Sequence, residues 1–482
     1  KKSQKQELTY SLSPVPVAST FIPKSGVAKA IDVGVKERLY TNFIAAGFGN
    51  NTTPYVELYF RNHKKFKNEY GIYAKYLSSE NSIETTPLNS NFSNINAGAF
   101  YQQKERYFDW RVGIDASRNK YNWYGLTNPL TVVNEEVAQV YSNYKINGAL
   151  FFEKSYIEKI ELNASLFSDN YDSNEFLFSL NGTFQFPLNR FWRRLKELQI
   201  TTSIEFLNGE FDRTYTSNTP INYGVFTLNI NPNYEFYFAN FKIKAGLKMF
   251  ASLDAENSSN NLLLYPDVKI SYPILKDYLT VFSGVTGNLN TNSYQHLVKI
   301  NPYISPTLFL TQTHEKYNLF GGIEGRITPD LGFRLKGTYK TEQDKLLFVK
   351  NNRNNTNTNG YANGNSFGLV YDDVSTVSIF GELEMDITKR MVVGTNAQFH
   401  MYTLENEEEA WNLPTIEATL FSKYKMNKWY AGIDLFFIGE RKERLYSSAE
   451  TIENLESYLD LNANGGYHFN DWFSAFIKLN NI

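Results

Sequence analysis

The sequence has no cysteine and no apolar run approaching the roughly 20 residues that a membrane-spanning helix needs. The absence of cysteine excludes disulfides, and a lipid-modified N-terminal cysteine, in the chain as given. It also fits a protein that crosses an oxidising periplasm without using disulfides. The net charge of -2 provides no strong positive field of the kind that nucleic-acid-binding proteins carry. If the chain crosses a membrane, it must therefore do so with strands.

Motifs for enzyme chemistry are also missing. The sequence contains no phosphate-binding loop, dinucleotide fingerprint or zinc motif. Its five histidines lie far apart, and although His296 and His314 fall in one long connection, no acid or nucleophile can be assigned to either. The acidic run Glu405–Glu409 lacks the spacing of a dedicated calcium loop, so a solvated loop is the preferred interpretation. We predict that the protein is not an enzyme and has no catalytic residue, cofactor or metal site.

What the sequence does contain is strict alternation of apolar and polar residues in segments of about ten residues, the length of a barrel strand. Successive side chains of a strand point to opposite faces, so such a segment has one apolar and one polar face. In residues 107–116 the apolar face consists of Phe108, Trp110, Val112, Ile114 and Ala116, and the polar face of Asp109, Arg111, Gly113 and Asp115. The same division recurs in residues 241–249 and 333–340. One face suits lipid and the other suits water.

The connections between these segments are alternately short and long. Short turns such as Pro329-Asp330 alternate with longer connections rich in Asn, Ser, Thr and Gly, such as 290–316 and 346–365. The alternation holds along the chain only if residues 366–387 form one long strand. Aromatic residues make up 16% of the chain, which suits the girdles at the two membrane interfaces. The pattern predicts an all-β, antiparallel up-and-down transmembrane β-barrel with about 21 strands in this chain, short periplasmic turns, long extracellular loops and a periplasmic N-terminus.

The end of the chain, Phe473–Ile482, resembles the penultimate strand of TonB-dependent receptors and transporters, which typically finishes in an Asn-Leu or Asn-Ile pair. A strand number near 22 resembles the same family, and barrels normally have an even number of strands. We therefore expect a last strand beyond residue 482, in preference to residues 7–12 filling the gap. The resemblance covers a barrel domain of residues 34–482 and implies a location in the Gram-negative outer membrane. The family also carries a large N-terminal plug domain. Here residues 1–33 are expected to form only an extended periplasmic or lumenal segment.

Charged residues on the polar faces are the candidates for a site in the lumen. They could form a wall that selects solutes, or a lining of cross-strand ion pairs that stiffens the barrel, and the second interpretation is preferred. The set comprises Lys242, Lys244 and Lys248 on one predicted strand and Glu324, Arg326, Arg334, Lys336, Lys340, Glu382, Glu384 and Asp386 on three consecutive strands. The tract Asn351–Gly360 is of low complexity and is predicted to be a mobile outer loop.

Two functions are compatible with these features. The first is a receptor-like barrel without a plug that passes or gates a solute, or that binds a ligand at the cell surface. The second is a non-transporting scaffold in a larger outer-membrane assembly, whose outer loops hold surface lipoproteins. Outer-membrane lipids are the expected partners in either case, with surface lipoproteins or other outer-membrane proteins in the second, and no nucleic acid in either. The fold alone does not decide between them.

Overall fold

The computed structural model describes residues 40–63, 67–80, 83, 86, 88–126, 137–188, 197–256, 259–446 and 450–482. All of them belong to a unit of residues 38–482, which is described here by itself. The predicted N-terminal segment, residues 1–33, lies outside the described residues. No helix within the described ranges is both long enough and apolar enough to cross a membrane.

The structure is built almost entirely from strands. The described elements are β1 (Asn42–Gly49), β2 (Thr53–His63), β3 (Asn68–Ser79), β4 (Phe92–Lys104), β5 (Phe108–Asn122), β6 (Ala138–Phe152), β7 (Ile157–Asp169), β8 (Asn174–Pro187), β9 (Glu197–Phe211), β10 (Ile221–Phe238), β11 (Phe241–Asp254), β12 (Ser259–Leu275), β13 (Leu279–Asn290), α1 (Tyr294–Ile300), β14 (Thr313–Thr328), β15 (Leu331–Lys350), η3 (Gly360–Ala362), β16 (Phe367–Thr388), β17 (Met391–Leu404), β18 (Ile416–Lys425), β19 (Trp429–Ile438), β20 (Arg441–Tyr446), β21 (Glu450–Leu455), β22 (Tyr458–His468) and β23 (Ser474–Leu479).

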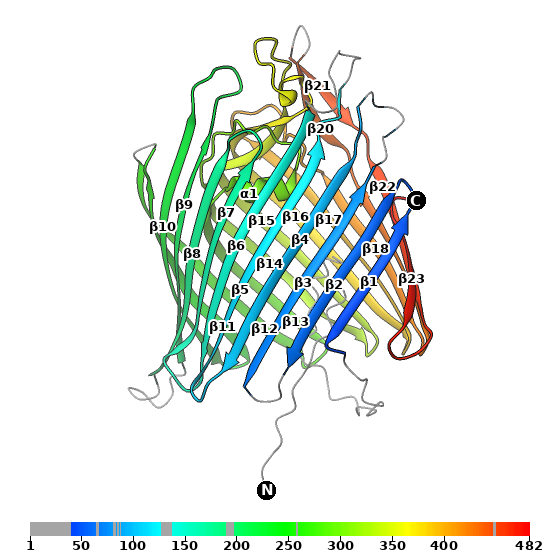
Figure 1. Ribbon diagram of the computed structural model, residues 1–482. Coiled ribbons are helices and arrows are strands. Elements are labelled where there is room, and N and C mark those ends of the chain that lie inside the picture. Colours follow the sequence, from blue (N-terminus) through cyan, green and yellow to red (C-terminus); the bar gives the residue numbers. More distant parts are fainter. Residues whose placement is uncertain are drawn as a thin grey trace. The chain divides into compact units, whose positions relative to one another are not determined.

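Twenty-one of these strands form one antiparallel sheet that curls into a barrel (Figure 1). Each strand pairs with the next along the chain, except that β19 pairs with β22 because β20 and β21 form a separate hairpin within the connection between them. The predicted barrel fold with about 21 strands is thus confirmed. The single long strand predicted for residues 366–387 is present as β16, Phe367–Thr388, as the alternation of connections required.

The connections divide the barrel into two unlike ends. At the short-turn end, neighbouring strands are joined by tight turns, as between β14 and β15 at Pro329-Asp330. At the long-loop end lie the longer connections, among them 291–312 between β13 and β14 and 351–366 between β15 and β16. Figure 1 shows α1 at the long-loop end, within the outline of the barrel wall.

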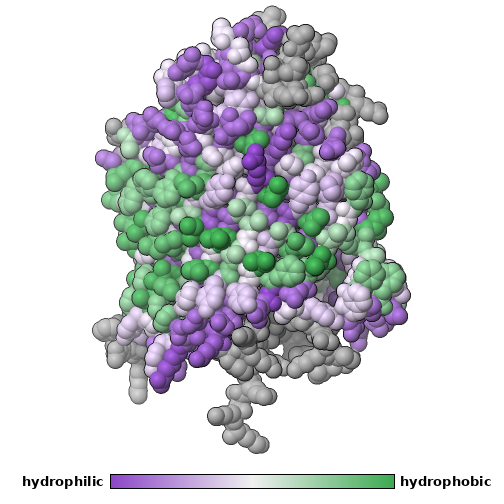
Figure 2. Space-filling view, in the orientation of Figure 1, coloured by the Kyte–Doolittle hydropathy of each residue, from purple (hydrophilic) through white to green (hydrophobic). Residues whose placement is uncertain are grey.

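The wall has the two faces that the alternation predicts. Val112 and Leu335 lie on the outer face and are 47% and 49% exposed. Residues adjacent to Leu335, such as Arg334 and Lys336, point to the opposite face, where Arg334 lies beside Glu382 of β16 in the ladder. Figure 2 shows hydrophobic residues gathered in a band around the middle of the visible face, with hydrophilic residues above and below. A band of this kind suits the hydrocarbon layer of a bilayer.

Leu335→Arg tests which face meets lipid. We expect this substitution to lower the free energy of unfolding in lipid vesicles by about 2–4 kcal/mol, because it places a cation on the lipid face near mid-bilayer. Thr338→Arg on the opposite face of the same strand is the matched control and should cost about 1 kcal/mol or less. Urea unfolding in phosphatidylcholine vesicles gives both values, and equal costs would show that the assignment of the two faces is wrong.

Candidate lumenal site

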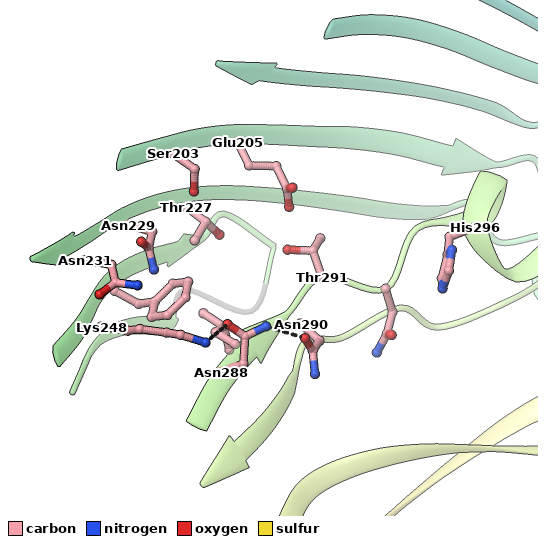
Figure 3. A pocket seen from close by; sticks show the side chains of 13 residues that line it. Ser203, Glu205, Thr227, Asn229, Asn231, Lys248, Asn288, Asn290, Thr291 and His296 are labelled. Carbon is pink, nitrogen blue, oxygen red and sulfur yellow. Dashed lines mark hydrogen bonds between the residues drawn. The ribbon is translucent and has the colours of Figure 1, made fainter. Parts of the chain in front are cut away.

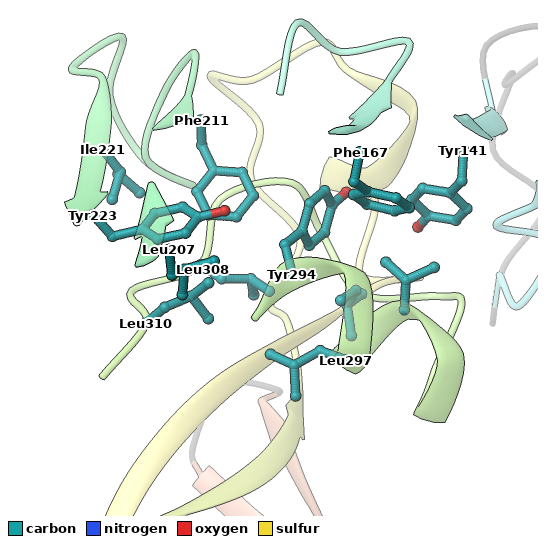
Figure 4. Packing of buried hydrophobic residues seen from close by; sticks show 12 residues of the cluster. Tyr141, Phe167, Leu207, Phe211, Ile221, Tyr223, Tyr294, Leu297, Leu308 and Leu310 are labelled. Carbon is teal, nitrogen blue, oxygen red and sulfur yellow. The ribbon is translucent and has the colours of Figure 1, made fainter. Parts of the chain in front are cut away.

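Several of the most deeply buried apolar side chains lie on residues 291–312, which we call the inward segment. Tyr294, Leu297, Ile304 and Leu308 of this segment are almost fully buried. They pack against the inner face of β6 to β10 and against partly buried residues of β15 and β16. Figure 4 shows Tyr294 between Phe167 on one side and Phe211 on the other. This connection was predicted as one of the long outer loops, and the structure adds that its apolar side chains fold back into the lumen.

The inward segment begins with the short helix α1, whose N-terminus is held from the barrel wall. Ser293 is the N-cap, and its hydroxyl accepts a hydrogen bond from the backbone N–H of His296. The carboxyl group of Glu175 on β8, which is 2% exposed, accepts the backbone N–H groups of Tyr294 at 2.5 Å and Gln295 at 2.9 Å. These N–H groups have no partner within a helix, so the wall supplies the acceptors that they need.

A glycine makes room for the third bond to Glu175. The hydroxyl of Tyr223 on β10 donates to Glu175 at 3.0 Å, and Gly209 of β9 lies between the two in the ladder. A Cβ atom on Gly209 would lie 2.2 Å from the Tyr223 ring and hydroxyl. Only glycine leaves enough space for the phenol to cross β9 and reach the carboxyl group.

Tyr294 connects α1 to the neighbouring strands through both its ring and its hydroxyl. The ring makes edge contacts with Phe167 and Phe211 at centroid distances of 5.2 and 4.9 Å. The hydroxyl donates to Asp169 at 2.7 Å. Burial, reinforced by the nearby Asp169, raises the pKa of Tyr294 well above its ordinary value. The phenol therefore stays neutral, and remains a hydrogen-bond donor, at physiological pH.

The second half of the segment is bonded to distant parts of the wall. On one side, Tyr141 of β6 donates to the carbonyl of Pro302 at 2.8 Å, and Trp123 donates to the carbonyl of Tyr303 at 3.1 Å. On the other side, the backbone of Phe367 at the start of β16 donates to Tyr303 at 3.0 Å and accepts from Ser305 at 2.8 Å. Strands β6 and β16 are ten positions apart in a barrel of 21 strands. The inward segment therefore extends across the lumen, from Tyr294 bonded to Glu175 on β8 to Ser305 bonded to Phe367 on β16.

A second connection packs beside the inward segment. Tyr361 and Ala362 of η3 form a buried cluster with Trp123, and Tyr303 of the inward segment packs against it. The tract Asn351–Gly360 leads into η3, where Asn357 is only 8% exposed and Asn354 donates to the carbonyl of Tyr215 at 2.8 Å. The tract was predicted to be mobile because of its composition. The structure shows that two of its amides bond to the backbone of Tyr215 and that its end is packed, while mobility of the rest stays a prediction.

A polar cavity of about 530 Å³ lies between the inward segment and the barrel wall (Figure 3). It is lined by residues of β9, β10, β11 and β13 and by the start of the segment itself. The lining residues are Ser203, Glu205, Thr227, Asn229, Asn231, Lys248, Phe250, Asn288, Leu289, Asn290, Thr291, Asn292 and His296. Five of these are asparagines, and one side chain of each charge is present.

Gln312 links three parts of the chain beside this cavity through side-chain hydrogen bonds. Its amide nitrogen donates to Thr227 at 3.0 Å and to Thr291 at 3.3 Å, while its amide oxygen accepts from Ser252. On the other side, Lys248 donates to the carbonyl of Gly287 at 2.9 Å and to the side chain of Asn288 at 3.3 Å. The cavity thus has fixed walls before any ligand is present.

The charged residues predicted from the sequence lie on the inner face of β11, β14, β15 and β16. Lys248 lines the cavity, and the ladder places Arg334 beside both Glu324 and Glu382. Ion pairs join Lys242 to Glu235, Lys244 to Asp267, Arg334 to Glu324 and Lys340 to Glu342. Lys336 lies over the ring of Phe320, Arg326 donates to the carbonyl of Pro329, and Glu384 and Asp386 continue the same face of β16 towards the short-turn end. That these residues select solutes stays a prediction.

Sequence reasoning missed the inward segment, Glu175 and most of the cavity. One signal was available: Tyr303–Leu310 is rich in apolar residues, which a fully solvated loop has no reason to carry. The asparagines of the cavity gave no such signal, because single polar residues on the inner face of a barrel strand are ordinary. The acidic run Glu405–Glu409 makes contacts within the protein, since Glu407 accepts from Trp411 and Glu409 pairs with Lys442.

No protein-family model matches the sequence, and no curated protein matches it either. Solved structures do resemble the fold. The siderophore receptor PirA from Acinetobacter baumannii superposes with a TM-score of 0.63 at 12% identity, over 91% of this chain and 75% of the receptor. The FrpB iron transporter from Neisseria meningitidis gives 0.66 at 9% identity, over 90% and 76%. A mutant of the ferric enterobactin receptor PfeA from Pseudomonas aeruginosa gives 0.60 at 11% identity, over 92% and 73%.

These neighbours are TonB-dependent receptors of the outer membrane. The chain therefore has the β-barrel fold of such receptors, as its last strand and strand number indicated. At identities of 9–12% the likeness extends to the fold and not to a ligand.

Proposed function

We propose that this protein is a receptor-like outer-membrane barrel that gates the passage of a solute, and that the inward segment is its gate. In this proposal the long-loop end faces the cell exterior and the N-terminus is periplasmic, because long loops are extracellular in bacterial barrels. The observation that carries the proposal is the path of residues 291–312 across the lumen, from Tyr294, which is bonded to Glu175 on β8, to Tyr303, which is bonded to Phe367 at the start of β16. The structural neighbours, named as receptors and transporters, support a function of this class.

The wall behind the segment is suited to passage. Its inner face carries ion pairs and cross-strand amides, whereas the most extensive cluster of buried apolar side chains gathers where the inward segment packs. Such a gate closes when the segment buries its apolar side chains and opens when the segment exposes them. The balance between the closed and open states therefore depends on individual contacts, which substitutions can remove one at a time.

Conductance in planar bilayers tests the gate. We expect the unmodified barrel to show little steady conductance, and a variant with residues 293–310 replaced by a Gly-Ser linker to conduct several-fold more. The linker starts after Asn292 and ends before Thr311, so it leaves the ladder between β13 and β14 intact. Heat-modifiable migration in gels verifies that the variant is still a folded barrel. Equal conductance of the two proteins would refute the proposal.

One observation favours the second function, a scaffold without transport. The hairpin of β20 and β21 lies outside the barrel sheet, and side chains of β21 such as Ile452 are exposed. Such a hairpin could hold a surface lipoprotein. A barrel that stays silent even after replacement of the inward segment, and that co-purifies with fixed partners until β20 and β21 are removed, would favour this alternative.

A further inference from the structure

We propose that the polar cavity beside the inward segment binds a neutral polyhydroxylated solute, the chemistry of a short oligosaccharide. The inference rests on the proposed function, because it names the class of solute that the gated lumen would take. It is carried by the chemistry of the cavity walls, by the free hydrogen-bonding groups that face the space, and by the balance of charge.

The walls consist mainly of groups that both donate and accept hydrogen bonds. Five asparagine amides and the hydroxyls of Ser203, Thr227 and Thr291 line the cavity. An amide offers two donors and an accepting oxygen, and a hydroxyl offers one donor and two lone pairs. A sugar presents the complementary set, because each of its hydroxyls donates once and accepts twice. A ligand that only accepts or only donates would leave half of these wall groups unpaired, at a cost in binding.

Several of these groups have no partner within the described part of the chain. No side-chain hydrogen bond or ion pair is described for Ser203 and Glu205 on β9, Asn229 on β10 or His296 on α1. Figure 3 shows these side chains arranged around one space, with Asn229 opposite Asn288 and Asn290. Polar groups that converge from separate elements and are free to bond are the usual mark of a small-molecule site.

The lining of the cavity has no net charge, and its one cationic side chain is already hydrogen-bonded within the protein. Glu205 is the only carboxylate in the lining and Lys248 the only ammonium group. The Lys248 ammonium already donates to Gly287 and Asn288, so it is not free to bind an anion with its full hydrogen-bonding capacity. Binding of an anionic metal chelate would require several unpaired cationic side chains, which the lining lacks. The free Glu205 carboxylate can accept from two neighbouring hydroxyls of a sugar.

The size of the cavity agrees with this ligand class. Its volume of about 530 Å³ lies within the ~300–1,000 Å³ range of small-molecule sites. The lining also contains Phe250 and Leu289, which supply an apolar surface for the C–H groups of a sugar ring. Thr291, Asn292 and His296 belong to the inward segment, so a bound solute would contact the wall and the proposed gate together.

A glycan array tests the proposal. The full chain is labelled and kept in lauryldimethylamine oxide, a detergent without a sugar headgroup, and is applied to an array of neutral and charged oligosaccharides. Ferric citrate and triglycine are titrated calorimetrically as rival ligands. We expect binding to at least one class of neutral oligosaccharide, and binding about tenfold weaker in Asn229→Ala, which removes up to two hydrogen bonds. Glu205→Gln should weaken binding only a few-fold, because the amide keeps an acceptor.

Asn163→Ala is the matched control, since Asn163 lies on the same inner face, on β7, away from the cavity, and should leave binding unchanged. The proposal is overturned if no neutral oligosaccharide binds, if Asn229→Ala and Asn163→Ala bind equally well, or if ferric citrate or triglycine binds in a manner that depends on Asn229. Its failure is distinguishable from failure of the gate, because oligosaccharide binding and the conductance change on segment replacement are measured independently.

Discussion

Glu175→Ala is expected to speed amide hydrogen exchange in residues 291–312 by about 100-fold. The substitution leaves three donors without their acceptor: the backbone N–H groups of Tyr294 and Gln295 and the hydroxyl of Tyr223. A buried donor without a partner costs about 1–3 kcal/mol, and partial access of water lowers the sum to roughly 3 kcal/mol for all three. That loss raises the population of the released segment about 100-fold. Exchange measured by mass spectrometry on peptides from this region gives the value directly.

Two further variants separate the hydrogen bonds from a general loss of stability. Gly209→Ala should release the segment by a smaller amount, because its Cβ displaces only the Tyr223 phenol from Glu175. Glu205→Ala removes a carboxylate from the neighbouring strand that has no described bond to the segment, and should leave exchange unchanged. If Glu175→Ala exchanges as slowly as Glu205→Ala, the anchoring of α1 by the wall is wrong.

The barrel could be predicted from the sequence because its signals are local. Alternation along one segment such as 107–116 assigns the two faces of β5, and the lengths of successive connections assign the ends of the barrel. Even the long β16 followed from this logic, since two short strands in its place would have broken the alternation. A pattern of period two can still be recognised when the predicted ends of a strand are wrong by several residues.

The inward segment could not be predicted in this way, because its position depends on contacts between residues far apart in the sequence. Trp123 and Tyr303 are separated by 180 positions, and Glu175 and Tyr294 by 119. The polarity of the surrounding connection suggested a solvated loop, and the apolar-rich stretch Tyr303–Leu310 was the only local sign to the contrary. Part of the candidate site was predictable: Lys248 was chosen from its strand face and does line the cavity. Asn229 and Glu205 were not, because nothing in their own strands distinguishes them.

The absence of native cysteine allows the gate to be locked by one engineered disulfide. Ile304 of the inward segment and Phe367 at the start of β16 are partners in an isolated parallel bridge. Bridge partners lie about 5 Å apart, within the range of Cα separations that a disulfide spans. Because the chain has no native cysteine, the pair Ile304→Cys and Phe367→Cys can form a disulfide without a competing thiol. The cysteine pair is introduced together with Glu175→Ala, which loosens the inward segment. The disulfide then ties the loosened segment to β16, from which the segment must separate for the gate to open.

Conductance of this triple variant, oxidised and then reduced in the same bilayer, tests the central claim most directly. The proposed gate requires a silent channel while the disulfide is intact, and openings at least as frequent as those of Glu175→Ala after dithiothreitol is added, because the reduced variant also lacks the buried Ile304 side chain. Each single-cysteine variant in the Glu175→Ala background controls for effects of the reductant and should conduct equally before and after its addition. An oxidised channel that conducts as well as the reduced one would show that residues 291–312 do not govern passage through the barrel.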